Sequence, residues 1–215
     1  DLDFSLDGLF ELNTKLDVIN GNVALHKSDQ AEALLNWQSG LLELQANNHV
    51  IHSHLSLYKN ETPNDTVLPV MKFTGQMSLT EHQDIAGQVF IDALPLAPLA
   101  IFSHEITTLQ AQISSQIEVS GTLTNPIING ELKLENGTMK LLKGPMPIED
   151  ISLIANFNNT HSTVEGTFAI ENKPAKLTST IDWQDSFKFN ADFITNELPI
   201  LYPPNFEATV SSHLN

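Results

Sequence analysis

Cysteine is absent from the chain of 215 residues, which can therefore form neither a disulfide framework nor a thiolate metal site. Cations are scarce too: Lys and Arg number 10 against 26 Asp and Glu, for a net charge of −16. Phosphate binding needs clustered cations, so this balance disfavours nucleic acid and anionic lipid headgroups as partners. If the chain meets lipid, we expect it to meet the acyl chains.

Long apolar runs are also missing. No stretch reaches the roughly 18 apolar residues that a membrane-spanning helix needs, and no signal peptide is visible. The chain opens at Asp1 rather than at Met. We therefore expect a piece or processed product of a longer protein, whose targeting and anchoring segments lie outside it.

What the sequence has in abundance is alternation of apolar and polar residues. Leu132 and Leu134 alternate with Glu131 and Lys133, and the same pattern recurs through most of the chain. Successive side chains of a β-strand point to opposite faces, so each such segment predicts a strand with one apolar and one polar face.

Short turn signals separate these segments. Asn20-Gly21 and Asn136-Gly137 are typical of type I′ hairpin turns, and Asn47-Asn48 and Asn158-Asn159 are weaker versions. Turns this tight join antiparallel neighbours. The pattern predicts an antiparallel meander of about 16 strands, each of about 6–9 residues.

One segment interrupts the meander at residues 92–110, where Pro95 and Pro98 disfavour a central strand. We expect a short helix or an apolar flap there, between a first β-rich half (residues 1–91) and a second (residues 111–215). With little helix to cover it, the apolar face leaves two arrangements open, a closed sandwich or a trough that holds something apolar.

Residues that could carry chemistry are few. His52 and His54 share one strand face, but no carboxylate or Cys stands at matching spacing, so we expect a polar face rather than a metal site. No nucleophile elbow, zinc-protease motif or phosphate-binding loop is present. We predict no enzyme, no cofactor and no metal.

An ordered series of motifs lies within residues 117–183. It reads IEVSGTLTNPIINGELKLENGTMK, then PIEDISLIANF, STVEGTF and STIDW. This series resembles the TamB family, the inner-membrane-anchored part of the translocation and assembly module of diderm bacteria. The resemblance extends over roughly residues 85–215, whereas residues 1–84 fit by period and composition. The matching positions are Gly121, Thr122, Leu123, Pro126, Gly130, Leu132, Leu134, Gly137, Ile148, Asp150, Ile151, Val164 and Gly166.

The resemblance implies an all-β fold, a long and largely antiparallel sheet curled into an open trough (a β-taco) with an apolar interior. It implies a periplasmic location, with the parent protein anchored in the inner membrane. It also implies partnership with an Omp85-type outer-membrane barrel (TamA) through other parts of the protein. The implied function is to carry phospholipid between inner and outer membranes, linked to outer-membrane protein assembly.

Together with the strand pattern, the resemblance predicts which residues line the lipid groove and contact phospholipid acyl chains. They are Leu35, Leu44, Leu55, Val89, Ile113, Ile117, Val119, Ile128, Leu132, Leu134, Met139, Leu141, Ile151, Leu153, Phe157, Val164, Phe168, Leu177, Ile181, Phe187, Phe189 and Phe193. Two alternatives stay open. One is a binding scaffold for unfolded outer-membrane β-barrel or autotransporter strands, and the other is a closed β-sandwich or β-solenoid surface module.

Overall fold

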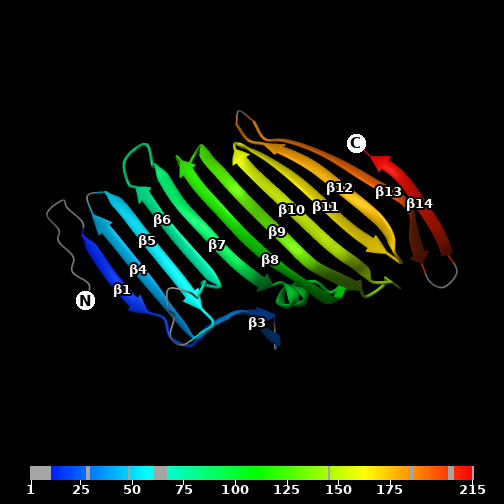
Figure 1. Ribbon diagram of the computed structural model, residues 1–215, viewed down its shortest axis with the longest axis horizontal. Coiled ribbons are helices and arrows are strands. Elements are labelled where there is room, and N and C mark those ends of the chain that lie inside the picture. The colour runs from blue at the N-terminus through cyan, green and yellow to red at the C-terminus, as the bar shows by residue number, and fades with distance from the viewer. Residues whose placement is uncertain are drawn as a thin grey trace.

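The fold was analysed in a computed structural model, which describes residues 11–27, 30–47, 49–60, 67–144, 146–184, 186–202 and 206–214. A 12-stranded sheet, here called the main sheet, dominates it, and β2 and β3 form a separate 2-stranded sheet. The main sheet is open, because β1 and β14 lie at its opposite ends and do not pair with each other (Figure 1). The predicted long antiparallel sheet, not closed into a barrel, is confirmed.

Strands follow one another in the main sheet in chain order, except that β1 pairs directly with β4. All pairs are antiparallel. The strands of the main sheet are β1 (Leu12–Asp17), β4 (Ser39–Asn47), β5 (Val50–Tyr58), β6 (Met71–Ser78), β7 (Ile85–Pro95), β8 (Ile106–Gly121), β9 (Pro126–Leu141), β10 (Ile148–Asn159), β11 (His161–Ile170), β12 (Lys173–Asp182), β13 (Lys188–Tyr202) and β14 (Phe206–Leu214).

Between β1 and β4 the chain leaves the main sheet to form the hairpin of β2 (Gly21–Lys27) and β3 (Gln30–Trp37). Leu35 of β3 forms a buried cluster with Leu57 of β5 and Val70, and Trp37 packs against that cluster. The hairpin also contacts the 3-10 helix η1 (Ala97–Phe102). Hairpin and helix therefore cover one stretch of the sheet, near the lower ends of the strands in Figure 1.

The 3-10 helix η1 lies within residues 92–110. Pro98 stands in its first turn, where a proline costs no hydrogen bond, and Pro98 and Ile101 are buried. Pro95 is the last residue of β7, at the end of the strand. Whether residues 1–91 and 111–215 act as separate halves stays a prediction. No helix in the described part of the chain is long and apolar enough to cross a bilayer.

The two Asn-Gly pairs do not form the predicted hairpin turns. Asn20 has a φ of 45°, but it lies where the chain leaves the main sheet, and Gly21 lies under the ring of Trp37, where a Cβ would clash. Asn136, with a φ of 53°, lies inside β9, which runs on to Leu141. There it forms a β-bulge, in which β9 has one more residue than its partner strand, and the strand continues beyond it.

The weaker turn signals do mark hairpins. Asn47 pairs with Val50 and Asn158 pairs with His161, so hairpins join β4 to β5 and β10 to β11 at these positions. Because Asn136-Gly137 does not end a strand, β8 and β9 reach 16 residues each, longer than predicted. The described residues hold fourteen strands rather than about 16.

Candidate functional site: the apolar face of the main sheet

Register gathers the apolar side chains of the main sheet on one side, here called the apolar face. Leu42 pairs with Leu55, Leu55 with Phe73, Phe73 with Val89, and Val89 with Ile117. Residues paired across an antiparallel sheet share a face, so this row runs without a break over five strands. A second row continues from Leu132 through Ala155 and Val164 to Ser179 and Ala191.

Most predicted lining residues lie on this face. By register and alternation they are Leu44, Leu55, Val89, Ile113, Ile117, Val119, Ile128, Leu132, Leu134, Met139, Leu141, Ile151, Leu153, Phe157, Val164, Phe168, Leu177, Ile181, Phe189 and Phe193. The bulge at Asn136 in β9 is matched by one at Asp150 in β10. The two bulges keep the apolar side chains of both strands on the same side. That these residues contact lipid stays a prediction.

Two predicted residues lie elsewhere. Leu35 belongs to β3 and reaches the apolar face from the covering hairpin, where it is 9% exposed. Phe187 precedes β13 and is 75% exposed, so it lies outside the paired part of the sheet.

The face also includes residues that sequence reasoning missed, on β6 and β7. Met71, Phe73 and Met77 pair with Ile91, Val89 and Ile85. The period-two signal was present in this segment but is diluted by Gly75 and Gly87, which pair with each other in the middle of it.

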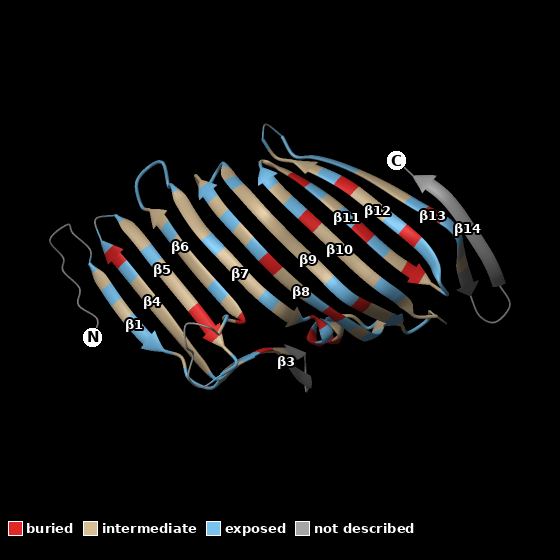
Figure 2. Ribbon diagram, in the orientation of Figure 1, coloured by how far each residue is buried: buried red, intermediate tan, exposed pale blue. Residues whose placement is uncertain are grey.

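The burial pattern indicates that, among the residues that the structure describes, no second layer of protein lies over most of the apolar face. Its buried residues are mainly small, such as Ala155, Ala175 and Ser162, whereas Phe157 and Leu177 are only half-buried. A covering layer would bury the large side chains, which reach furthest from the sheet, before the small ones. In Figure 2 the buried positions are accordingly isolated bands among half-buried and exposed ones. The hairpin and η1 cover only one part, so the closed-sandwich alternative does not hold for the described residues.

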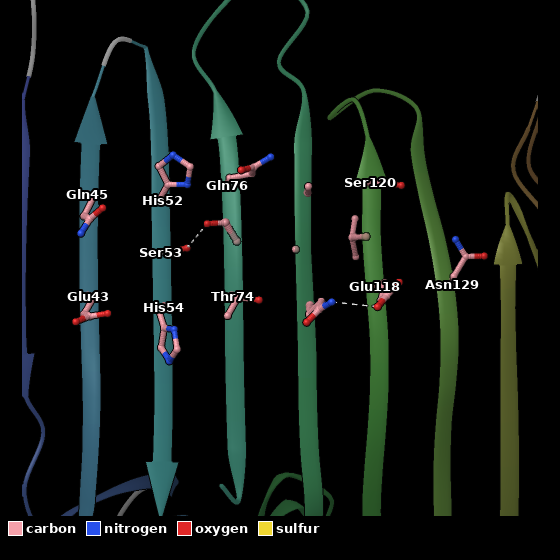
Figure 3. Close-up of a pocket in the computed structure, with 15 residues that line it drawn as sticks. Glu43, Gln45, His52, Ser53, His54, Thr74, Gln76, Glu118, Ser120 and Asn129 are labelled. Carbon is pink, nitrogen blue, oxygen red and sulfur yellow. Dashed lines mark hydrogen bonds between the residues drawn. The ribbon is translucent and has the colours of Figure 1, made fainter. Parts of the chain in front are cut away.

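The opposite face is polar and hollowed over β4 to β9 (Figure 3). The hollow, about 670 Å³, is lined by polar side chains that include His52, His54 and Glu118. His54 Nε2 lies 2.7 Å from Ser56 Oγ, and Gln88 donates to Glu118 at 3.0 Å. No group of three or more metal-ligating side chains occurs in the part of the chain that the structure describes.

Ion pairs between charged side chains also link neighbouring strands of the main sheet. Lys15 Nζ of β1 lies 2.9 Å from Glu43 Oε1 of β4, and Lys173 of β12 lies 2.7 Å from Glu197 of β13. The hydrogen bond from Lys15 holds the pKa of Glu43 below its ordinary value and raises the pKa of Lys15. Because these groups are exposed, water and salt screen them, and they contribute little to stability.

Comparison with known proteins identifies the family. The sequence profile described as "TamB, N-terminal domain" matches residues 3–134, more than half of the chain. The chain belongs to the TamB family. The match begins well before residue 85, so the first half, which fitted only by period and composition, is part of the TamB resemblance. The match to the family profile ends at residue 134.

A curated TamB relative points the same way. The "Translocation and assembly module subunit TamB" of Haemophilus influenzae is 24% identical to this chain over 105 residues. The matched stretch is 49% of this chain but only 8% of that protein. No solved structure matches the chain.

Proposed function

We propose that this chain is a segment of a TamB-family groove that carries phospholipid across the periplasm between the inner and outer membranes. The parent protein would be anchored in the inner membrane and act in a translocation and assembly module with an Omp85-type barrel (TamA). This role needs no catalysis. The single observation that carries the proposal is the row of apolar side chains that crosses five strands of the main sheet, from Leu42 to Ile117, on a face that the described residues leave largely uncovered.

The energetics of lipid transfer explain why such a face is needed. Burying one methylene group stabilises it by about 0.8 kcal/mol, so the transfer of an acyl chain of about 16 carbons into water costs about 12 kcal/mol of free energy. An apolar face that continues from strand to strand offers the sliding chain equivalent contacts at each position. Because Leu55, Phe73, Val89 and Ile117 stand in one row, no polar side chain interrupts that path.

A matched pair of substitutions tests the proposal. Phe168→Arg places a charge on the apolar face, and Thr167→Arg places the same charge on the neighbouring exposed position of the polar face. Phospholipid with a photoreactive acyl chain should crosslink to the wild type and to Thr167→Arg, but much less to Phe168→Arg. Leu134→Arg and Leu153→Arg should reduce capture in the same way, with circular dichroism as the control for folding. Unchanged capture by all three variants of the apolar face would contradict the proposal.

A second crosslinking experiment addresses the scaffold alternative. A scaffold for unfolded outer-membrane strands would bind at the edges of the sheet, because edge strands present unpaired N–H and C=O groups. An unfolded barrel segment should then crosslink to edge positions of β1, and Phe168→Arg should have little effect on it. Capture of lipid on the apolar face without capture of strands at the edge would set this alternative aside.

A further inference from the structure

A pocket of about 380 Å³ opens where the hairpin meets the main sheet. Here called the rim pocket, it lies between β3, Val70, β7 and the end of β5, and its volume falls within the range of small-ligand sites. Leu35, Trp37, Val70 and Leu94 form its apolar part. Leu35 and Val70 also belong to the buried cluster beneath the hairpin, which fixes the hairpin against the apolar face.

Two opposite charges also line the rim pocket. Lys59 follows β5 and Asp92 lies in β7, and both side chains are exposed. They belong to the part of the chain that the structure describes, and no ion pair joins them there. The pocket therefore offers a cation and a carboxylate that do not neutralise each other, beside an apolar wall.

The backbone around Asp92 departs from regular strand geometry. The register of β7 against β8 shifts between Ile91 and Leu94, so Asp92 and Ala93 form a bulge. Ala93 has a φ of 47°, a conformation that residues with a Cβ rarely adopt, and its N–H is bonded to Ser114 Oγ at 3.2 Å. Bulges often redirect side chains at functional sites, and this one holds Asp92 in the pocket wall.

The rim pocket is continuous with the apolar face. Leu94 pairs with Ile113, Ile113 with Leu134, and Leu134 with Leu153. A ligand with its polar end between Lys59 and Asp92 could therefore lay an apolar tail along this row.

We propose that the rim pocket binds the zwitterionic headgroup of a phospholipid, with its phosphate at Lys59, its ammonium at Asp92 and its acyl chains on the apolar face. This inference rests on the proposed function and specifies its substrate class. An anionic lipid would meet Asp92 without an ammonium to pair with it, in a chain of net charge −16.

The test compares three single-chain lipids with the same acyl chain: lysophosphatidylethanolamine, lysophosphatidylglycerol and monoacylglycerol. Their dissociation constants are measured below the micelle concentration. The zwitterionic lipid should bind tightest. Lys59→Gln and Asp92→Asn should each weaken it by about two- to five-fold, the effect of an exposed charge pair, and leave monoacylglycerol unchanged. Lys143→Gln is the matched control, because Lys143 is exposed and does not line the rim pocket.

The possible outcomes separate the two proposals. If all three lipids bind equally, if lysophosphatidylglycerol binds tightest, or if the Lys59 and Asp92 variants behave like Lys143→Gln, the headgroup site is contradicted while the acyl groove stands. If monoacylglycerol and the two lysophospholipids all fail to bind, both proposals are contradicted. The rim pocket is supported if the wild type and Lys143→Gln prefer lysophosphatidylethanolamine, whereas Lys59→Gln and Asp92→Asn lose that preference.

Discussion

The ring of Phe168 on β11 stacks on the ring of Phe193 on β13, with centroids 6.2 Å apart and planes inclined by 19°. The two strands are not neighbours, since β12 lies between them. Ala175 of β12 pairs with Phe168 on one side and Thr195 on the other and is only 2% exposed, because larger side chains flank its small one. Large residues beside small ones thus give the apolar face local packing without a second layer.

This stack should be measurable as a coupling energy. In a double-mutant cycle of Phe168→Leu and Phe193→Leu, we expect a coupling of about 0.5–1.5 kcal/mol in the free energy of unfolding, the usual value of an aromatic pair beyond its buried area. Urea denaturation of the four proteins supplies the four free energies. Strictly additive effects would mean that the two rings do not interact in solution.

A second prediction concerns the hairpin that covers part of the apolar face. Because Trp37 lies directly over Gly21, Gly21→Ala should displace the indole and cost about 1–3 kcal/mol, the usual cost of overpacking. A red shift of Trp37 fluorescence in a Trp183→Phe background, together with a lower urea midpoint, would report the displacement.

Gly166→Ala is the matched control for the hairpin. A Cβ at Gly166 would meet its closest neighbour, the carbonyl oxygen of Ser152, at an ordinary 3.6 Å. This variant should therefore leave both the fluorescence and the urea midpoint nearly unchanged. If Gly21→Ala is equally silent, Trp37 does not pack over Gly21.

The strand pattern of this fold could be read from the sequence, whereas the connections could not. Alternation such as that of residues 131–134 depends only on which face of a strand is buried, and it predicted the apolar face. Asn136 adopts the positive φ that the first position of such a turn would need, but pairing with β10 makes Asn136 and Gly137 part of a bulge instead. Their local signal is the same in both cases, so only the partner strand decides between them.

The covering hairpin and the rim pocket could not be predicted from the sequence either. Residues 21–37 show the same alternation of apolar and polar residues as the other strands. No local sequence signal indicates that β1 pairs with β4 and that β2 and β3 form a separate hairpin. Lys59 and Asp92 lie 33 positions apart in the sequence and meet at one pocket only because β5, β6 and β7 are consecutive antiparallel neighbours. Long-range contacts of this kind follow from topology.

A third prediction follows from the ion pair between β1 and β4. Because Lys15 lowers the pKa of Glu43 below 4.5, the pair stabilises the fold above pH 4.5, and this contribution is lost as the pH falls through the lowered pKa. Because Glu43 raises the pKa of Lys15 above 10.5, the contribution persists below pH 10.5 and is lost as the pH rises through the raised value.

Carboxyl titration by NMR checks this pairing. In Lys15→Gln, the pKa of Glu43 should rise toward its ordinary value. In Lys133→Gln, which removes the lysine bonded to Glu131, the pKa of Glu43 should stay where it is in the wild type. A Glu43 pKa that does not respond to Lys15→Gln would show that the pair does not form in solution.

The most direct test of the acyl groove uses the absence of cysteine. Val164 lies on the apolar face of β11, and its neighbour Thr163 is exposed on the polar face. Val164→Cys and Thr163→Cys are close in size to the native residues, and each can carry one environment-sensitive fluorophore. On addition of phospholipid with a nitroxide on its acyl chain, the label at position 164 should be strongly quenched and the label at position 163 should not. Equal quenching at both positions, or none at position 164, would contradict the claim that the apolar face holds acyl chains.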